Sequence, residues 1–382
     1  MVQSPYTALD RWLHWLALEP QTVRRMCFDL ERQFYLPKEP QQAAQGAVYV
    51  CGLARSGTTI LLRILDAIPE LQSLTYRAMP FVLAPNLWRA AHGARHRSVP
   101  EVMRAHKDGL FVDLDSPEGL EEVFWNTFGH AIRDTTSRTL DYQTPSPATL
   151  AAFADYRSLV ANPKGGTTVP GRPPKRYLSK NNNNLMRIAS LCADPSARVL
   201  LNYRDPVDTA RSLYRQHQGF CEAQAAERFT RKYMGWLAHH EFGLDHLPFA
   251  FARAYMVPGL QPEDPNYWLD YWSAVHHHIL LQQPHNLHLV NHDALRSQPA
   301  RVLGQVLETL SLKANATALA KMVRATSSSS ADPTQPQHTE RLSREARDMA
   351  LSAPTEFSSD LLRRAHTIHA SLRASEHNLI TI

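Results

Sequence analysis

The sequence predicts an α/β protein built around a parallel β-sheet, and three observations lead to this fold class. Short apolar, β-branched segments such as AVYVCGL at residues 47–53 alternate with helical patterns along the chain. Strands separated by helices pair in parallel, and a parallel sheet is covered by helices on both faces. A glycine-containing loop joins the first strand to a helix. With 43% apolar and 20% charged residues, the chain has a globular composition.

We expect one domain over residues 1–382, although this length would also allow two or three. Residues 46–75 and 175–312 would form the α/β core, after an N-terminal helical segment at 1–45. Residues 76–174 would form a helical insertion. Residues 313–382 would form a helical tail, in which the polar stretch 325–340 is a candidate lid.

Periodicity, length and flanking turn residues predict the other elements. Further strands are expected at 74–77, 175–180, 197–204 and 287–292. Helices are expected before Pro69, from Ser116, near 146–160, at 184–192, from Asp205–Pro206, at about 221–246 and 265–283, and from about 298. Ser116 would cap its helix, with Pro117 in the first turn and Glu118 favouring the positive helix end.

Charge and cysteine usage exclude several classes of protein. The formal charge is only +5, and no block of Lys and Arg suggests nucleic-acid binding. No apolar run reaches the roughly 18 residues of a membrane span, and the N-terminus lacks the features of a signal peptide. The four cysteines lie far apart, which argues against a zinc cluster and fits a reducing compartment. We therefore expect a cytoplasmic protein without a metal site.

The most informative segment is the loop from Gly52 to Thr59, GLARSGTT, between a buried strand and a helix start. Backbone N–H groups in such a loop can point at one anion, and the helix dipole adds partial positive charge. The spacing of the two glycines matches a nucleoside-triphosphate loop, but Thr58 stands where that motif has Lys. Arg55 supplies a positive charge from inside the loop. A simple turn between strand and helix is the alternative interpretation.

A second segment, RDPVDTARS, runs from Arg204 to Ser212 and also follows a buried strand. Its ends could hold a second phosphate together. By itself it could equally be a capped helix start, with Asp205 at the cap and Pro206 in the first turn. The presence of the first loop favours the phosphate interpretation.

At these two segments the chain resembles the sulfotransferase family, whose members move a sulfuryl group from 3′-phosphoadenosine-5′-phosphosulfate (PAPS) to an acceptor. GLARSGTT is similar to the 5′-phosphosulfate loop, and RDPVDTARS to the 3′-phosphate segment. RSGTTILLRILDAIPEL resembles the tyrosylprotein and bacterial branches, and NHDALRSQPARVLGQVL resembles their late strand and helix. The resemblance is clear over residues 46–75 and 175–312. It implies a P-loop-type three-layer α/β/α fold.

The resemblance also implies roles for individual residues. The 5′-phosphosulfate would be held by Arg55, Ser56, Gly57, Thr58 and Thr59. The 3′-phosphate would be held by Arg204 and Ser212. Lys180 matches a lysine that reaches the bridging oxygen in relatives. Arg55 and Lys180 would stabilise the charge on the leaving oxygens, so that no metal is required.

The chain departs from the family at the catalytic base. Asn182 stands where cytosolic members have a histidine base, and residues 75–78 lack the glutamate of the tyrosylprotein branch. The basic late loop that clamps the 3′-phosphate in relatives has no match, although Arg341, Arg344 and Arg347 follow the polar stretch.

An alcohol acceptor still requires a general base. The insertion offers several candidates in AHKDGLFVDLDSPEGLEEVFW, namely His106, Asp108, Asp113, Asp115, Glu118, Glu121 and Glu122. We prefer His106 and Glu118 for their titration range and expected helix position. Glu121 and Glu122 would equally fit a solvated helix face. Consecutive residues such as His239, His240 and Glu241 point in different directions on a helix and are not expected to act together.

The predicted function is sulfuryl transfer from PAPS to a hydroxyl, with an amine as the second choice. The acceptor would be a small molecule, a carbohydrate or a lipid. One alternative is a P-loop nucleotide kinase or nucleoside triphosphatase, which would depend on magnesium and ATP. The other alternative is a degenerate, non-catalytic PAPS-binding protein, which the asparagine at position 182 would suit.

Overall fold

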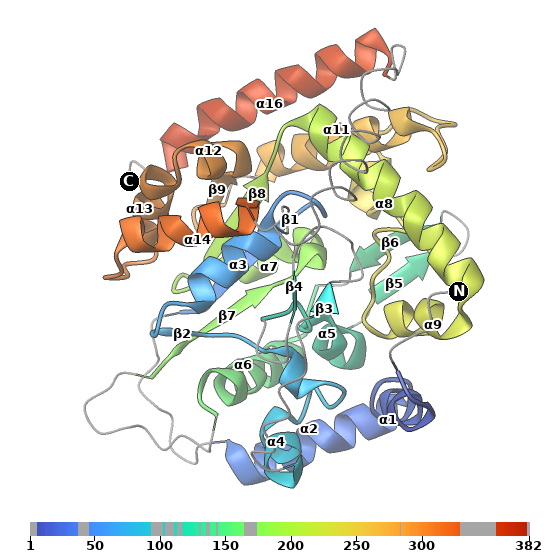
Figure 1. Ribbon diagram of the computed structural model, residues 1–382, viewed down its shortest axis with the longest axis vertical. Coiled ribbons are helices and arrows are strands. Elements are labelled where there is room, and N and C mark those ends of the chain that lie inside the picture. Colours follow the sequence, from blue (N-terminus) through green and yellow to red (C-terminus); the bar gives the residue numbers. More distant parts are fainter. Residues whose placement is uncertain are drawn as a thin grey trace.

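The computed structural model describes the greater part of the chain: residues 6–36, 46–92, 102–103, 111–112, 117–129, 131–134, 138–142, 144–163, 174–282, 284–328 and 357–379. Its centre is a five-stranded sheet in the order β2-β7-β1-β8-β9, and every pair in it is parallel (Figure 1). The strands are β1 (Val48–Gly52), β2 (Leu71–Gln72), β7 (Arg176–Lys180), β8 (Arg198–Tyr203) and β9 (Leu287–Asn291). The predicted fold class is confirmed.

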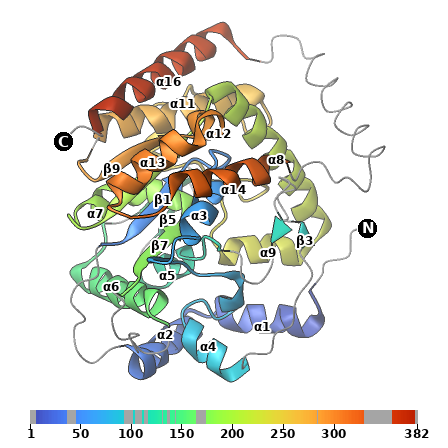
Figure 2. The ribbon, with the colours of Figure 1, turned by 60° about the vertical axis from the view of Figure 1, so that its left-hand side comes forward.

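Successive residues of a strand point to opposite faces of the sheet, and helices cover both faces here. On one face Val48 and Val50 pack with α3 (Thr58–Asp66), α13 (Pro299–Thr309) and α14 (Ala316–Ser328). On the other face Tyr49 and Cys51 pack with a larger apolar cluster. That cluster includes residues of α6 (Pro147–Ala161), α8 (Pro206–Ala226), α11 (Pro265–Gln282) and α16 (Ser359–Leu379). Figures 1 and 2 show the resulting three layers.

The insertion differs from the predicted helical segment. It contains α4 (Pro85–His92), α5 (Glu122–Phe128) and α6, but also two antiparallel pairs of short strands. These are β3 (Val102–Met103) with β4 (Phe111–Val112), and β5 (Ala131–Asp134) with β6 (Thr139–Tyr142). The predicted helix start at Ser116 is also wrong. Pro117 forms a bridge with Thr75, and the helix begins only at Glu122.

Two further predictions need correction. The strand expected at 74–77 lies at Leu71–Gln72, and Tyr76–Ala78 form a short 3-10 helix, η1. The helix expected at 221–246 is the end of α8 followed by α9 (Arg228–Trp236), with an irregular segment after it. The remaining short elements are η2 (Asn182–Arg187), α7 (Ile188–Cys192), α10 (Ala250–Arg253) and α12 (His292–Ser297).

The N-terminal and C-terminal helices pack against the core from two sides. The N-terminal helices α1 (Ala8–Leu18) and α2 (Gln21–Tyr35) lie at the lower edge in Figure 1, whereas α16 lies across α11 at the top. The predicted lid falls mostly outside the described residues. Among the described helices, none combines the length and the apolar composition that a membrane span requires.

Candidate active site

The loop from Leu53 to Gly57 has the backbone geometry of an anion-binding turn. Arg55 has φ 70° and Gly57 φ 88°, both in the left-handed region, and α3 begins directly afterwards at Thr58. A Cβ atom on Gly57 would lie 2.1 Å from Nδ1 of His292, so only glycine fits there. The Oγ atom of Ser56 is buried without a hydrogen-bond partner among the described residues. A helix N-terminus with an unused hydroxyl is suited to a phosphate group.

The two predicted phosphate segments meet at one edge of the sheet. β1 pairs with β8, so the loop after β1 lies beside the turn after β8. Nε of Arg55 donates to Oγ of Ser212 over 3.0 Å. Ligands of open α/β sheets bind at the carboxyl ends of the strands, where both segments lie.

Arg204 follows β8 and lies among carboxylates and one imidazole. Its guanidinium is 3.0 Å from Asp208 and 3.8 Å from Asp293. Asp205 caps α8 by accepting from the N–H of Asp208, and Pro206 opens the helix, as the capped-start interpretation predicts. Burial and the nearby Arg204 lower the pKa of His292 to about 4, so this imidazole is neutral at pH 7. The positive charge at this edge therefore belongs to the arginines.

Lys180 and Asn182 lie on the other side of the phosphate loop. Lys180 ends β7 and is paired in register with Val50 of β1. The N–H of Asn181 donates to the carbonyl of Val50 (3.0 Å), and Oγ1 of Thr58 donates to Oδ1 of Asn182 (3.4 Å). Lys180 is buried, and these contacts place the end of β7 next to the loop from Gly52 to Thr59.

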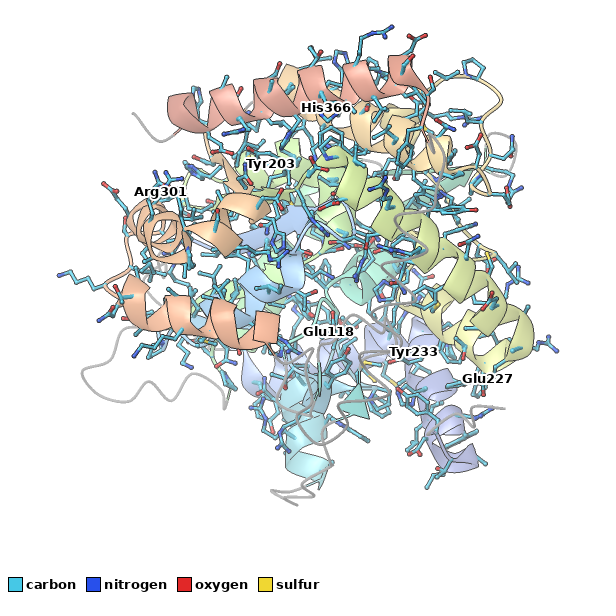
Figure 3. All side chains as sticks on the ribbon, turned by 45° about the horizontal axis from the view of Figure 1, so that its top comes forward. Glu118, Tyr203, Glu227, Tyr233, Arg301 and His366 are labelled. Carbon is cyan, nitrogen blue, oxygen red and sulfur yellow. The ribbon has the colours of Figure 1, made fainter. Side chains whose placement is uncertain are left out.

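Glu118 lies near Lys180, although not at a helix start. Its N–H donates to the carbonyl of Leu74, and its carboxylate accepts from the Tyr76 hydroxyl (2.8 Å) and from its neighbour's N–H at Gly119 (2.9 Å). A Cβ atom on Gly119 would lie 2.3 Å from the carbonyl oxygen of Lys180. Figure 3 shows Glu118 beside Tyr233 of α9. The insertion therefore brings one carboxylate, that of Glu118, into contact with residues 75–78, which have none of their own.

Glu121 and Glu122 are not on a solvated face, because both are buried. The carboxylate of Glu121 accepts hydrogen bonds from the side chains of Tyr177 (2.9 Å), Ser179 (2.5 Å), Asn184 (3.1 Å) and Trp125 (3.0 Å). Glu122 forms an ion pair with the fully buried Arg187. Buried charges persist when paired and hydrogen-bonded in this way. These two residues fix the segment after β7 and are not available as bases.

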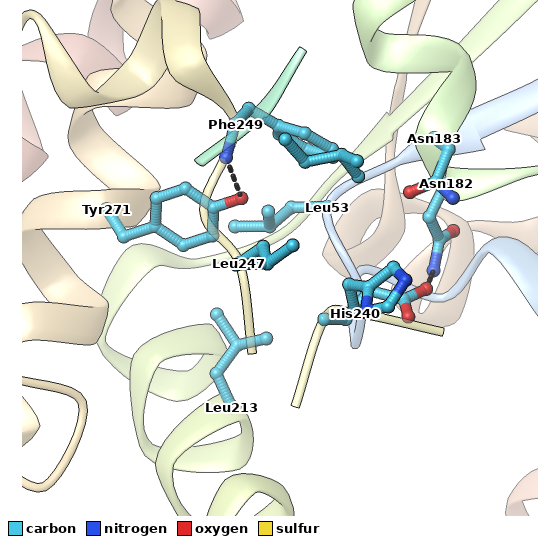
Figure 4. A pocket seen from close by; sticks show the side chains of 11 residues that line it. Leu53, Asn182, Asn183, Leu213, His240, Leu247, Phe249 and Tyr271 are labelled. Atoms are coloured by element: carbon cyan, nitrogen blue, oxygen red, sulfur yellow. Dashed lines mark hydrogen bonds between the residues drawn. The ribbon is translucent and has the colours of Figure 1, made fainter. Parts of the chain in front are cut away.

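A small pocket adjoins the phosphate loop. Its lining is mostly apolar, with one polar side (Figure 4): Leu53, Ala54, Leu140, Leu213, Leu247, Phe249 and Tyr271, and Asn182, Asn183, His240 and Glu241. Sequence reasoning missed Glu241 and its neighbour His239, because both were expected within a helix. The run of four asparagines after Lys180 was the available signal, since a polar run behind a buried strand needs polar partners.

Other predicted residues lie outside the described part of the chain. These are His106, Asp108, Asp113, Asp115, Arg341, Arg344 and Arg347. Within the described part, no group of three or more His, Cys, Asp or Glu side chains could hold a metal ion.

Comparison with known proteins gives the class of the molecule. The family model described as "Sulfotransferase family" matches residues 47–316, and the chain belongs to this family. A comparison with curated proteins finds no match.

Several solved sulfotransferases have a similar structure. STF1 of Mycobacterium tuberculosis H37Rv is 14% identical with a TM-score of 0.45, covering 86% of this chain and 88% of its own. STF9 of Mycobacterium avium is also 14% identical with a TM-score of 0.45, covering 85% and 78%. Mouse SULT7A1, in complex with PAP, is 12% identical with a TM-score of 0.33, covering 81% and 71%.

Proposed function

We propose that this sulfotransferase takes its sulfuryl group from PAPS and transfers it to a hydroxyl of a small molecule, carbohydrate or lipid. The observation that carries the donor assignment is the hydrogen bond between Arg55 and Ser212. It joins the loop suited to a 5′-phosphosulfate with the helix suited to a 3′-phosphate. A donor with phosphates at both positions would contact both segments at once.

Residues of the phosphate loop fit the sulfated end of such a donor. The unpartnered Oγ of Ser56 and the backbone N–H groups at the start of α3 would donate to it. Thr58 and Thr59 would add hydroxyl donors. Arg204 and Ser212 would hold the 3′-phosphate, with Arg204 exchanging its contact with Asp208 for the ligand.

The reaction is in-line transfer, in which positioning and charge stabilisation supply most of the catalysis. Arg55 and Lys180 would stabilise the negative charge that develops on the leaving phosphate oxygen. The prediction that His106 or Glu118 is the general base stays a prediction. Both carboxylate oxygens of Glu118 accept a hydrogen bond, from Gly119 and Tyr76, so it would have to release one of them to take a proton.

Calorimetry with 3′-phosphoadenosine-5′-phosphate, the desulfated donor, tests the donor assignment. We expect binding without magnesium and a much weaker response to magnesium-ATP. A preference for magnesium-ATP would instead support the nucleotide kinase. Transfer of labelled sulfate from PAPS to a panel of alcohols and phenols then separates an enzyme from a non-catalytic donor-binding protein.

A further inference from the structure

His239 and Glu241 form a pair beside the end of β7. Nδ1 of His239 lies 3.3 Å from Oε2 of Glu241, and the side chains are 28% and 15% exposed. The two residues face each other because helix α9 ends at Trp236 and the chain is irregular from there. A helix through 246 would have kept them apart.

The segment that carries the pair is fixed at several points. Nδ2 of Asn182 donates to Oε1 of Glu241 (3.4 Å), and Nδ2 of Asn183 donates to the carbonyl of Ala238 (3.2 Å). Ala238 has φ 54°, a left-handed conformation that costs about 1–3 kcal/mol for a residue other than glycine. The N–H of Leu247 donates to the carbonyl of His240 (3.0 Å). Such strain persists only where surrounding contacts impose it, and it is concentrated at functional sites.

The electrostatics of the pair suit proton transfer. Burial by itself would raise the pKa of Glu241, but the adjacent His239 and the Lys180 ammonium lower it to about 2. The carboxylate is therefore ionised at neutral pH and accepts the proton on Nδ1 of His239. That tautomer leaves the lone pair on Nε2, the nitrogen that a histidine base uses when a carboxylate holds its other nitrogen.

We infer that His239, oriented by Glu241, is the general base that accepts the proton of the acceptor hydroxyl. This inference rests on the proposed sulfuryl transfer. The acceptor oxygen forms a bond to sulfur while the bond from sulfur to the bridging phosphate oxygen breaks. The electron pair of that bond stays on the phosphate oxygen near Lys180, and the hydroxyl proton passes to Nε2 of His239. Glu241 acts as a positioning residue.

Two of the titratable groups near the pair, Tyr271 and His246, keep one charge state around neutrality. Tyr271 of α11 faces Glu241, and its burial raises its pKa well above the ordinary value. His246, in the loop that follows, is also buried, which lowers its pKa to about 3. Lys180 faces the pair from β7. His240, between the two residues of the pair, also lines the pocket, so the pH profile is interpreted only by comparison with the His239 variants.

The test compares His239→Asn and Glu241→Gln with His285→Asn, which replaces an exposed histidine away from the loop. Sulfate transfer from labelled PAPS is measured to an aliphatic alcohol, to water and to 4-nitrophenol, which is largely ionised at slightly alkaline pH. His239→Asn should lower kcat for the alcohol and water by roughly 100-fold or more, the usual contribution of a general base. The loss should be at most a few-fold for 4-nitrophenolate, which needs no base. His285→Asn should leave all rates unchanged.

The pH profile separates a base from a structural residue. A general base acts only in its unprotonated form, so wild-type kcat should fall towards acid pH, and His239→Asn should lose that limb. Glu241→Gln should move the limb to lower pH, because the imidazole loses its anionic neighbour. Added imidazole should restore part of the rate of His239→Ala.

Unaltered transfer in His239→Asn would overturn the inference, and so would either of two other results. One is an equal loss of rate with the alcohol and with 4-nitrophenolate. The other is an acid limb that survives in His239→Asn and disappears in Glu118→Gln, which would make Glu118 the base. Calorimetry with the desulfated donor on each variant keeps the proposals distinct. Wild-type protein that ignores this nucleotide would refute PAPS as donor, whereas normal binding with unaltered transfer in His239→Asn would refute only the base.

Discussion

Arg55 and Ser212 are joined by a 3.0 Å hydrogen bond, although one belongs to the first loop of the sheet and the other to helix α8. The contact links the two segments on which the donor assignment depends. Binding at either segment should therefore influence the other.

Arg204→Ala should weaken binding of the desulfated donor by about 10- to 100-fold, in line with about 1.5–3 kcal/mol for hydrogen bonds to a charged group. Binding of adenosine 5′-phosphate, which lacks the 3′-phosphate, should change little. Calorimetry with both nucleotides provides the measurement. Arg198→Ala, at the opposite end of the same strand, is the matched control. Equal losses for the two nucleotides would remove Arg204 from the 3′-phosphate site.

Lys180→Met should leave affinity for the desulfated donor within a few-fold of wild type and lower the transfer rate by roughly 100- to 1000-fold. The reason is that Lys180 is assigned to charge that develops only as the sulfuryl group leaves. Single-turnover transfer from labelled PAPS measures the chemical step directly. Lys175→Met changes an exposed lysine just before the same strand and should be silent. A large loss of nucleotide affinity with normal transfer would contradict the assignment.

Gly57→Ala should destabilise the loop and abolish nucleotide binding. Its φ of 88° strains an alanine by about 1–3 kcal/mol, and the new Cβ would lie 2.1 Å from His292. Gly304→Ala is the control. This glycine lies inside α13 with nothing within 4 Å of an added Cβ, so alanine should stabilise by roughly 0.5–1 kcal/mol. Thermal unfolding compares the two, and an unchanged midpoint for Gly57→Ala would show that the turn tolerates a side chain.

Glu376 should make the attachment of α16 sensitive to pH. Its carboxyl group is hydrogen-bonded to the Tyr203 hydroxyl, and burial raises its pKa from 4.5 to about 7. The folded state therefore holds the proton between these values while the unfolded chain has released it. Stability is full below about pH 4.5, falls as the pH rises to 7, and is constant above that. Because the group is only half-buried, we expect a loss of about 1 kcal/mol rather than the full shift.

Protection factors of the α16 amides at pH 5 and pH 8, which are exchange rates corrected for the intrinsic rate at each pH, measure this loss. Glu376→Gln should remove the difference between the two pH values, because glutamine does not titrate. Glu308→Gln, at an exposed position of α13, should keep it. Weaker protection of α16 at pH 5 than at pH 8 would reverse the expected sign and refute the prediction.

Local signals were sufficient for four of the five strands of the sheet and for the turn between β1 and α3. A buried strand, a glycine-containing loop and a helix start lie within residues 47–66, so the pattern needs no distant partner. β8 and the Asp205–Pro206 helix start were equally local. These elements could be predicted because strand burial, turn chemistry and capping act over a few residues.

The errors arose where distant contacts decide the local structure. Ser116, Pro117 and Glu118 have the residue types of a helix start, but Pro117 bridges Thr75 and the helix begins only at Glu122. Similarly, the helical pattern at 221–246 continues past Glu227, whose side chain pairs with Arg11 of the N-terminal helix. The helix is interrupted at Glu227 and ends after Trp236. Tertiary partners of this kind are not visible in a short window of sequence.

The same limitation concealed the pair formed by His239 and Glu241. Their proximity depends on an irregular segment whose shape is fixed by the amides of Asn182 and Asn183. Sequence spacing indicated a helix there, on which the two side chains would diverge. The imidazole of His239 and the carboxylate of Glu241 come close to Asn182 and Asn183 only when the segment after β7 and the segment after α9 are packed together.

The order of strands in the sheet also affects how the chain folds during its synthesis. β1 is first in the sequence but central in the sheet, and both of its neighbours, β7 and β8, are synthesised after the entire insertion. During translation the glycine loop therefore emerges long before Ser212 exists to meet Arg55. A nascent chain that stops before β8 has no Ser212 to meet Arg55, and its apolar first strand can pair on one side only, with β7. An unpaired strand edge favours association with other chains, so products truncated before β8 should aggregate more readily than the full chain.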